Sequence, residues 1–364
     1  MTSKDKFFSN KLLEWYEKNQ RELPWRKNIR HKDYPYRVLV SEFMLQQTTV
    51  ATVIPYFKKF INEWPTLKKL SHAKIEDVLL FWQGLGYYSR AKNLLKTVKI
   101  IDEDYNGKIP KDKINLIKLP GIGEYASAAI SSIAFNKKAV AIDGNVKRVI
   151  ARYYEIRGND KSFEKKISEI AERICPNSKN RSYTQAVMEL GAIICRPKNS
   201  DCHNCCLKSK CSAHKKNTVD LIPTIKSKPL KQKLNCISFL TIHNNSKILL
   251  KKRTGKKILA NQWEIPSTNW KVKPVKFSKK STPIPNAKWK KTNVEFKHSF
   301  SHIDLKNTVY KSNINNSQIQ FNEDDLKWVD LKKLNKYAVT TMSKKALNLP
   351  VSYTHLTLPT SDLV

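Results

Sequence analysis

The sequence predicts a mainly α-helical N-terminal region followed by a small α+β domain. Between residues 7 and 194, apolar residues recur at helical spacing in runs of about 10–16 residues, and no alternating strand pattern interrupts them. From residue 235 the pattern changes to short strand-like runs separated by turns. A chain of 364 residues is long enough to bury a separate core in each region.

Composition indicates a globular protein with a polyanionic partner. Hydrophobic residues make up 40% of the chain, and its net charge is +37. Such an excess favours nucleic-acid binding, but 56 of the 68 basic residues are Lys, a bias that an AT-rich genome imposes on any protein. The sequence has no run of 18 apolar residues and no signal-peptide pattern at its start. We therefore expect an intracellular, cytoplasmic protein without a membrane segment.

The first two expected helices cover residues 7–22 and 36–52, and Leu23-Pro24-Trp25-Arg26 ends the first of them. Glu42 lies inside the apolar second helix. A carboxylate at such a position is costly unless it is paired or neutral, and burial raises its pKa. The alternative is a surface Glu on an amphipathic face, which periodicity alone does not exclude.

Glycine-containing turns punctuate the next helices. Residues 55–70 and 75–82 continue the helical pattern, and the turn 84–90 opens a helix over 91–104. Six of the nine glycines lie between Gly84 and Gly144, so these turns are the expected approach to DNA.

The stretch 119–154 carries two signals about 20 residues apart. Leu119-Pro120-Gly121-Ile122-Gly123 ends one helical pattern and begins another. Its glycines let backbone N–H groups approach a ligand closely, and the following helix N-terminus favours an anion. Leu119, Gly121 and Gly123 are thus a predicted cradle for a DNA phosphate. Asp143 then stands before a helix over 146–154. A plain turn and a helix N-cap are the alternatives when each signal is taken alone.

Two more helices, 162–174 and 182–194, lead to a cysteine cluster with the spacing C-x6-C-x2-C-x5-C. Its expected ligands are Cys195, Cys202, Cys205 and Cys211. Four thiolates can hold zinc or an iron–sulfur cubane, but structural zinc usually uses two tight cysteine pairs and this loop has one. Spacing assigns the third ligand to Cys205 rather than Cys206. The sequence gives Cys206 no role, and Cys175 and Cys236 are expected core thiols.

Residues 212–234 are polar, basic and interrupted by prolines, as in a linker. Strands are expected over 235–242 and 247–252 around an Asn-Asn turn, then over 293–300 and 307–313, with a helix near Ser343. The final VSYTHLTLPTSDLV breaks the compositional bias and is interpreted as non-native. The predicted organisation is a catalytic region (1–218, with the cysteine loop 195–211), a linker (219–234), a C-terminal domain (235–350) and a non-native tail (351–364).

Taken together, these motifs resemble the helix-hairpin-helix/Gly-Pro-Asp glycosylase superfamily. The stretches that carry the resemblance are LPWR, SEFMLQQT, GLGYYSRA, LPGIGEY, DGNV, ELGA and the cysteine loop. DGNV and Tyr125 are similar to its MutY-type adenine DNA glycosylases. The cysteine spacing is similar to the [4Fe-4S] loop of the endonuclease III and MutY branches. The C-terminal domain resembles the Nudix-like domain of MutY proteins, although it lacks the acidic REXXEE-type helix of Nudix hydrolases.

The resemblance implies a two-module helical fold that flips adenine out of duplex DNA where it is mispaired with 8-oxoguanine or guanine. It makes Glu42 the acid that protonates the leaving base and Asp143 the carboxylate that stabilises the sugar cation, with Tyr125 and Asn145 positioning Asp143. The remaining implied substrate contacts are Trp25, Arg26 and Glu189 in the adenine pocket, Gln47 and Tyr87 in the gap beside the lesion, and Ser301 and His302 at the opposite base.

Three alternatives remain open at this point. An endonuclease III-like bifunctional glycosylase/lyase needs a Lys where this chain has Tyr125. A non-catalytic iron–sulfur DNA-binding protein has no need for the pair Glu42 and Asp143. A Nudix hydrolase of oxidised nucleotides is disfavoured by the missing acidic helix. The expected protein is a monomeric, monofunctional DNA glycosylase with a [4Fe-4S] cluster.

Overall fold

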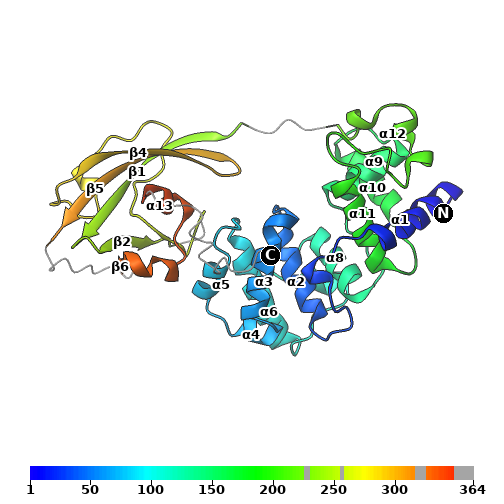
Figure 1. Cartoon of the computed structure of the whole chain (residues 1–364), viewed down its shortest axis with the longest axis horizontal. Helices are drawn as coiled ribbons and strands as arrows, with labels where there is room; N and C mark the ends of the chain where they lie inside the picture. The colour runs from blue at the N-terminus through cyan, green and yellow to red at the C-terminus, as the bar shows by residue number, and fades with distance from the viewer. Residues whose placement is uncertain (225–229, 255–257, 316–324, 348–364) are drawn as a thin grey trace, which may run out of the picture. The chain divides into compact units, whose positions relative to one another are not determined.

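The computed structural model describes residues 1–224, 230–254, 258–315 and 325–347. These residues form two compact units, one made of residues 1–73 and 89–224 and the other of residues 74–88 and 230–347. The first unit is helical and the second contains the sheet (Figure 1), which confirms the predicted fold class. Within the described ranges, no helix is both long and apolar enough to cross a membrane.

The helices of the first unit are α1 (Ser3–Asn19), α2 (Tyr34–Leu45), α3 (Val50–Glu63), α4 (Leu67–Ser71), α6 (Ser89–Asp104), α7 (Lys113–Leu116), α8 (Glu124–Phe135), α9 (Gly144–Tyr154), α10 (Lys161–Ile174), α11 (Asn180–Ile193) and α12 (Ser212–Lys215). Short 3-10 turns lie at Pro24–Arg26, Lys208–Lys210 and Val219–Leu221. The helices expected over 7–22, 91–104, 146–154, 162–174 and 182–194 are all present with small shifts of their ends.

Helix α8 is the central packing element of the first unit. Nine of its twelve residues, Ala126 through Ala134, are buried, and most of them are Ala or Ser. Small side chains let neighbouring backbones approach closely, and α2, α7 and α11 all pack against α8. The helix therefore connects the segment that carries Glu42 to the segment that carries Glu189.

The expectation of one helix over 36–52 was wrong. Helix α2 ends at Leu45, and Gln47 adopts a left-handed backbone with φ of +58°. The buried Arg90 guanidinium donates hydrogen bonds to the carbonyls of Phe43, Met44 and Gln46 at 2.5–3.2 Å. A helix leaves its last carbonyls without intrahelical partners, so this remote arginine caps α2. The polar Gln46-Gln47-Thr48 run is consequently a loop.

Two other boundaries differ from expectation. The run 55–70 divides at Pro65, where the Thr66 hydroxyl caps the separate helix α4 by accepting from the Lys69 amide at 3.2 Å. The segment expected to be a linker from residue 212 instead packs on the first unit through the 3-10 turn Val219–Leu221. Ala213 and Ile222 are buried in the core formed by α1, α9, α10 and α11. The linker expected over 219–234 includes residues 225–229, which lie outside the described residues.

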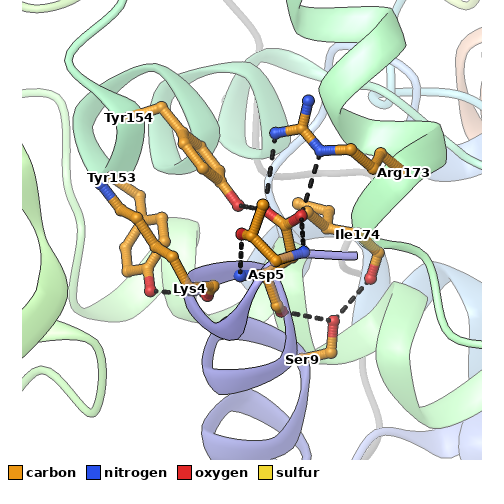
Figure 2. A network of polar contacts seen from close by, with 8 residues as sticks. Lys4, Asp5, Ser9, Tyr153, Tyr154, Arg173 and Ile174 are labelled. Atoms are coloured by element: carbon orange, nitrogen blue, oxygen red, sulfur yellow. Dashed lines mark hydrogen bonds and ion pairs between the residues drawn. The ribbon is translucent and has the colours of Figure 1, made fainter.

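Hydrogen bonds to Asp5 connect helix α1 to α9 and α10 (Figure 2). The Tyr154 hydroxyl donates to the Asp5 carboxylate at 2.6 Å, Arg173 Nε donates at 3.1 Å, and the Thr2 amide donates at 2.7 Å. Burial alone would raise the Asp5 pKa, but these three donors outweigh burial and lower the pKa to about 2. Asp5 has no exposed surface, so the N-terminal helix depends on an ionised, fully bonded carboxylate.

The second unit contains α5 (Ile75–Phe81), β1 (Gln232–His243), β2 (Lys247–Lys252), β3 (Trp263–Glu264), β4 (Lys290–Ser299), β5 (Ile303–Ile314), β6 (Leu326–Asp330) and α13 (Thr341–Ala346), with 3-10 turns at Lys279–Ser281 and Leu331–Lys336. The described strands form a mixed sheet in the order β3-β2-β1-β5-β4, with β6 beside β2. Strands β1 and β5 are parallel over twelve residue pairs, whereas β4 and β5 form an antiparallel hairpin.

The sheet confirms the expected strands, the β1–β2 hairpin and the helix near Ser343. The stretch 271–291 is largely irregular. The proposed non-native tail, 351–364, lies outside the described residues. Strand β4 ends at Ser299 and β5 begins at Ile303, so Ser301 and His302 occupy the turn of an exposed hairpin.

Candidate active site

Asp143 occupies the N-terminus of α9, where both of its carboxylate oxygens have donors. Its Oδ1 accepts from the Val146 amide at 2.7 Å, which is N-cap geometry, and its Oδ2 accepts from the Asn145 side-chain amide at 2.8 Å. Asp143 is therefore held in one orientation as an acceptor.

A buried arginine connects this carboxylate to the start of the cysteine loop. Arg148 Nη2 donates to the Asn145 side-chain oxygen at 2.8 Å and to the Gly191 carbonyl at 2.7 Å. Its Nε donates to the Cys195 carbonyl at 2.7 Å. The guanidinium thus forms a continuous hydrogen-bonded connection from Cys195 through Asn145 to Asp143.

Glu42 projects from α2 and is buried, with 6% of its surface exposed. Burial raises its pKa, and the nearby charge of Asp143 raises it further. A hydrogen bond from Tyr125 and the charge of Arg26 act in the opposite direction, and the result is a pKa of about 7. Two carboxylates with separate environments therefore lie near each other: Glu42 is buried and has a pKa near neutrality, whereas the oxygens of Asp143 accept hydrogen bonds from two donors.

Tyr125, at the start of α8, lies between these two acids. Burial raises the pKa of its hydroxyl well above the ordinary value, and the charges of Glu42 and Asp143 raise it further. Its hydroxyl also lies 3.8 Å from the Met188 sulfur. Tyr125 is thus a neutral hydrogen-bond donor in the site.

The residues expected to line an adenine pocket are brought together, but with an additional partner. Glu189 on α11 is fully buried, and its Oε2 lies 2.6 Å from Arg26 Nη1. Its Oε1 accepts from the backbone amide and the Nε of Arg21, both at 2.8 Å. Trp25 is buried edge-on against Phe57, with ring centroids 5.3 Å apart. The pocket side chains are therefore held by ion pairing and packing.

The expected phosphate cradle lies between α7 and α8. Gly121 has φ of +78° and Leu119 is buried, whereas Gly121 and Gly123 are exposed. A Cβ at Gly121 would come within 2.9 Å of Phe43 and within 2.7 Å of Asn93, so a side chain does not fit there. A Cβ at Gly123 would meet no atom within 4 Å, which leaves the hairpin open to an approaching ligand. The helix-hairpin-helix geometry is present as predicted.

The four expected ligand cysteines line one hollow of about 310 Å³, a volume that includes its open mouth. Cys205 lines this hollow and Cys206 is not among its lining residues. Arg152 also lines it, with Nη1 3.5 Å from the Cys195 sulfur, and the Cys211 thiol donates to the Arg152 carbonyl at 3.5 Å. Burial raises the pKa of Cys195 and of Cys211. In the described ranges, no three His, Cys, Asp or Glu side chains converge tightly enough to bind one metal ion.

The remaining predicted contacts lie on loops. Gln47 and Tyr87 are both exposed and both have left-handed backbones, with φ of +58° and +45°. Ser301 and His302 are exposed, and the Ser301 hydroxyl lies 3.0 Å from His302 Nδ1. Tyr87, Ser301 and His302 belong to the second unit, whereas Gln47 belongs to the first.

Sequence reasoning missed Arg21, Arg148 and Gly191. The charge of Arg21 at the end of α1 carries no signal of its contact with Glu189, 168 residues away. Arg148 follows Asp143 by five positions on a helix that begins with a candidate carboxylate, which was a usable signal. Gly191 lies within the ELGA motif, but the need for glycine at this position appears only in the packing. An added Cβ would meet the Asn145 Cβ at 2.6 Å.

Comparison with known proteins agrees with this geometry. Residues 40–177 match the family described as HhH-GPD superfamily base excision DNA repair protein, and residues 238–349 match the NUDIX domain. The adenine DNA glycosylase of Buchnera aphidicola subsp. Schizaphis graminum is 41% identical over 307 residues, covering 82% of this chain and 85% of that protein. The adenine DNA glycosylase of Homo sapiens is 29% identical over 402 residues, covering 94% of this chain and 73% of that protein.

Solved structures show the same helical fold. A thermostable thymine-DNA glycosylase superposes with a TM-score of 0.52 at 30% identity, covering 58% of this chain and 97% of that one. An endonuclease III bound to DNA superposes with a TM-score of 0.50 at 24% identity, covering 60% of this chain and 99% of that one. The paired acids and the helix-hairpin-helix turn agree with the identity to these relatives over most of the chain. The chain belongs to the adenine DNA glycosylases of the HhH-GPD superfamily.

Proposed function

We propose that this DNA glycosylase excises adenine mispaired with 8-oxoguanine or guanine, and that it does so without cutting the DNA strand. The observation that carries the proposal is the pair formed by Glu42, with a pKa of about 7, and Asp143, whose two oxygens accept hydrogen bonds. Removal of a neutral purine needs an acid and a fixed negative charge near the same sugar, and this pair supplies both.

Glu42 is the proposed general acid. Adenine is a poor leaving group, so its N7 must gain a proton as the glycosidic bond stretches. The target base has to leave the stack before a side chain can reach that atom. A carboxyl with a pKa near neutrality is protonated in a large fraction of molecules and still transfers its proton readily. Burial of Glu42 provides that pKa.

Asp143 is the proposed partner of the sugar. Departure of the base leaves an oxocarbenium-like centre, and an ionised carboxylate held beside it stabilises the developing charge or forms a bond to it before water arrives. Asn145 and the Val146 amide fix the carboxylate before the reaction, so little reorganisation is needed. Tyr125 donates its hydrogen bond to Glu42 rather than to Asp143.

Arg26, Glu189 and Trp25 are the proposed walls of the adenine pocket. Glu189 is fully buried between Arg21 and Arg26, so its charge is compensated before substrate arrives. Arg26 also acts on Glu42 through its charge, which couples the pocket wall to the acid. A planar guanidinium and an indole are suited to the edge and face of a purine.

Tyr125 is the reason to propose a monofunctional enzyme. A bifunctional glycosylase attacks the sugar with a Lys amine and forms a Schiff base that leads to strand cleavage. The Tyr125 hydroxyl cannot form that bond. Water is therefore the final nucleophile in this proposal, and the product is an abasic site.

The cysteine hollow is the proposed site of a [4Fe-4S] cluster. The four cysteines whose spacing favours an iron–sulfur cluster all line this hollow, so their thiolates would be the ligands that hold it. Bound there, the cluster would hold the loop 195–211 in its fold through its metal–thiolate bonds. Arg152 would lie beside a negatively charged group, since its guanidinium already contacts Cys195.

The DNA contacts are proposed from exposed loops. The hairpin of Leu119, Gly121 and Gly123 presents backbone amides to a phosphate. Gln47 and Tyr87 would fill the space that the flipped base leaves, and Ser301 and His302 would contact the base opposite it. We propose that the enzyme acts as a monomer inside the cell, with residues 1–218 as the catalytic region and 235–350 as the lesion-recognition domain.

The test is single-turnover incubation with duplexes that carry adenine opposite 8-oxoguanine, guanine or thymine. Excision with the first two and not with thymine, and strand cleavage only after alkali, is the expected result. Glu42→Gln and Asp143→Asn should each abolish excision while duplex binding persists. Strand cleavage without alkali, or rapid adenine release by Glu42→Gln, would contradict the proposal.

A further inference from the structure

The hairpin turn between β4 and β5 is supported by aromatic side chains from a different part of the chain. This turn, Phe300–His302, is named here the recognition loop. The Phe300 ring stacks on Trp270, with centroids 5.4 Å apart and planes inclined by 29°. His298 contacts the edge of the Phe300 ring at 4.6 Å. Trp270 lies in the segment after β3, 30 positions before Phe300, so the stack is a tertiary contact.

Trp270 has a second contact, with Arg253. The Arg253 guanidinium lies 5.3 Å from the centre of the indole ring, within the range of a cation–π contact. Both terminal oxygens of Glu264 accept from Arg253 Nη1 at 2.8 Å, and Arg253 Nε donates to the Ile258 carbonyl at 3.1 Å. Glu264 is buried, with 6% exposed, so the ion pair holds the guanidinium in a defined place.

The backbone of the recognition loop is tied at both ends, whereas its two polar side chains project into solvent. The Phe300 amide donates to the Ile303 carbonyl at 2.7 Å, and the Gln232 amide donates to the His302 carbonyl at 3.0 Å. Ser301 and His302 are exposed, and the Ser301 hydroxyl lies 3.0 Å from His302 Nδ1. Their direction is therefore set by the backbone and by the anchoring of Phe300.

We propose that Arg253 and Trp270 are positioning residues for base discrimination, acting through Phe300 to hold Ser301 and His302 in register with the base opposite adenine. This inference rests on the proposed function of the recognition loop. A connected array from a buried carboxylate through an arginine, an indole and a phenyl ring fixes the turn more closely than a hairpin alone, because each member is held by the next. Discrimination between two bases that differ at one edge requires such placement.

The experiment compares Trp270→Leu, which removes the stack, with Trp270→Phe, which keeps a ring for both Arg253 and Phe300. The matched control is Trp289→Leu, since Trp289 packs on Phe239 elsewhere in the same unit at 5.3 Å. Single-turnover excision and binding are measured opposite 8-oxoguanine and opposite guanine at one salt concentration. The Ser301→Ala/His302→Ala double variant sets the scale for loss of the loop.

Trp270→Leu should lower the ratio of the two rates on the order of tenfold, as expected for loss of one good base contact. Trp270→Phe should restore most of the ratio, and Trp289→Leu should keep it. An unchanged ratio in Trp270→Leu, with a lowered ratio in the double variant, overturns the positioning role and leaves the function of the loop intact. Equal losses in the Leu and Phe variants also overturn it, because they indicate a fold defect.

A second readout separates the inference from the proposed function. The ring resonances of ¹³C-labelled histidines report the loop directly, and His302 and His298 should shift or broaden in Trp270→Leu. His243 contacts Trp328, at 5.2 Å, and should not change. If the double variant leaves the ratio unchanged, the loop does not read the opposite base. In that case the His302 resonance alone tests whether Trp270 positions His302. An unchanged His302 resonance in Trp270→Leu would overturn the positioning role.

Discussion

Gly191 lies so close to Asn145 that a Cβ at Gly191 would be 2.6 Å from the Asn145 Cβ. The contact joins the last turn of α11 to the first turn of α9, and Asn145 in turn donates to Asp143. Since real side-chain carbons do not approach this closely, the helices must separate if any residue larger than glycine occupies position 191. The position of the Asp143 carboxylate therefore depends on the absence of a side chain at position 191 on the neighbouring helix.

We predict that Gly191→Ala lowers single-turnover excision by up to about 100-fold, the size of effect expected when a reacting group moves by about an ångström. DNA binding should change much less, because the hairpin proposed to contact phosphate lies between α7 and α8. Ala192→Ser, at the next and exposed position, is the matched control. Full activity of Gly191→Ala would show that α9 and α11 adjust without moving Asp143.

Much of the fold and the centre of the site were predictable from local patterns. Asp143 stands directly before a segment with apolar residues at helical spacing, and Glu42 interrupts a strongly apolar segment. Both carboxylates can therefore be picked out from the sequence. Leu119, Gly121 and Gly123 can be predicted to form a turn because they separate two helical patterns. The four cysteines are recognisable by spacing alone, and all four line one hollow.

The remaining features depend on contacts between distant residues. The end of α2 is determined by Arg90, 44 to 47 positions later, so the pattern around Gln46 could not place it. Arg21 meets Glu189 only after α1 and α11 have packed. The stack of Trp270 on Phe300 joins an irregular segment to a hairpin. Periodicity describes one segment at a time and carries no information about such pairs.

The cysteine hollow should hold iron and acid-labile sulfide. Anaerobically purified protein should be brown, and Cys202→Ser should lower the iron content sharply, because one thiolate of four is lost. Cys206→Ser is the matched control and should keep its iron, since Cys205 rather than Cys206 lines the hollow. Elemental measurement of zinc without iron would contradict the assignment, as would equal iron loss in both variants.

Asp5 should make the N-terminal helix sensitive to acid. Its pKa falls from an ordinary value of 3.8 to about 2, so the folded state favours the ionised carboxylate by about 2 kcal/mol at neutral pH. A depressed pKa gives stability that is present above pH 4 and is lost as the pH falls through about 2. Asp5→Asn should therefore cost about 2 kcal/mol of unfolding free energy at pH 7.

Urea unfolding at several pH values measures this effect. The difference between wild type and Asp5→Asn should shrink steadily below pH 4, because the wild-type carboxylate then gains its proton. Asp104→Asn, at the exposed end of α6, should change the free energy by less than about 0.5 kcal/mol. A deficit in Asp5→Asn that is the same at pH 7 and pH 3 would show that packing, not charge, is responsible.

Tyr125→Lys should convert part of the reaction to a covalent route. A Lys at this position would lie in a buried site beside Glu42 and Asp143, where its amine could attack the opened sugar and form a Schiff base. Borohydride should then trap a protein–DNA adduct that wild type does not form. Tyr125→Phe is the control and should give no adduct. Equal trapping by wild type and Tyr125→Lys would refute the monofunctional assignment.

The pH dependence of excision should follow the protonation of Glu42. The acid is active only while it carries its proton, and its pKa is about 7, raised by burial and by Asp143. Single-turnover rates should therefore be highest below pH 7 and should fall about tenfold per pH unit well above it.

Arg26→Gln removes a positive charge that lowers the pKa of Glu42, so the falling limb of the rate profile should move to higher pH in that variant. Glu42→Gln should show no measurable excision at any pH and should unfold no more easily than wild type at pH 8, since its amide has no charge to bury. A wild-type rate that stays constant from pH 6 to pH 9 would exclude Glu42 as the proton donor, whereas an unshifted limb in Arg26→Gln would place Arg26 outside its electrostatic environment.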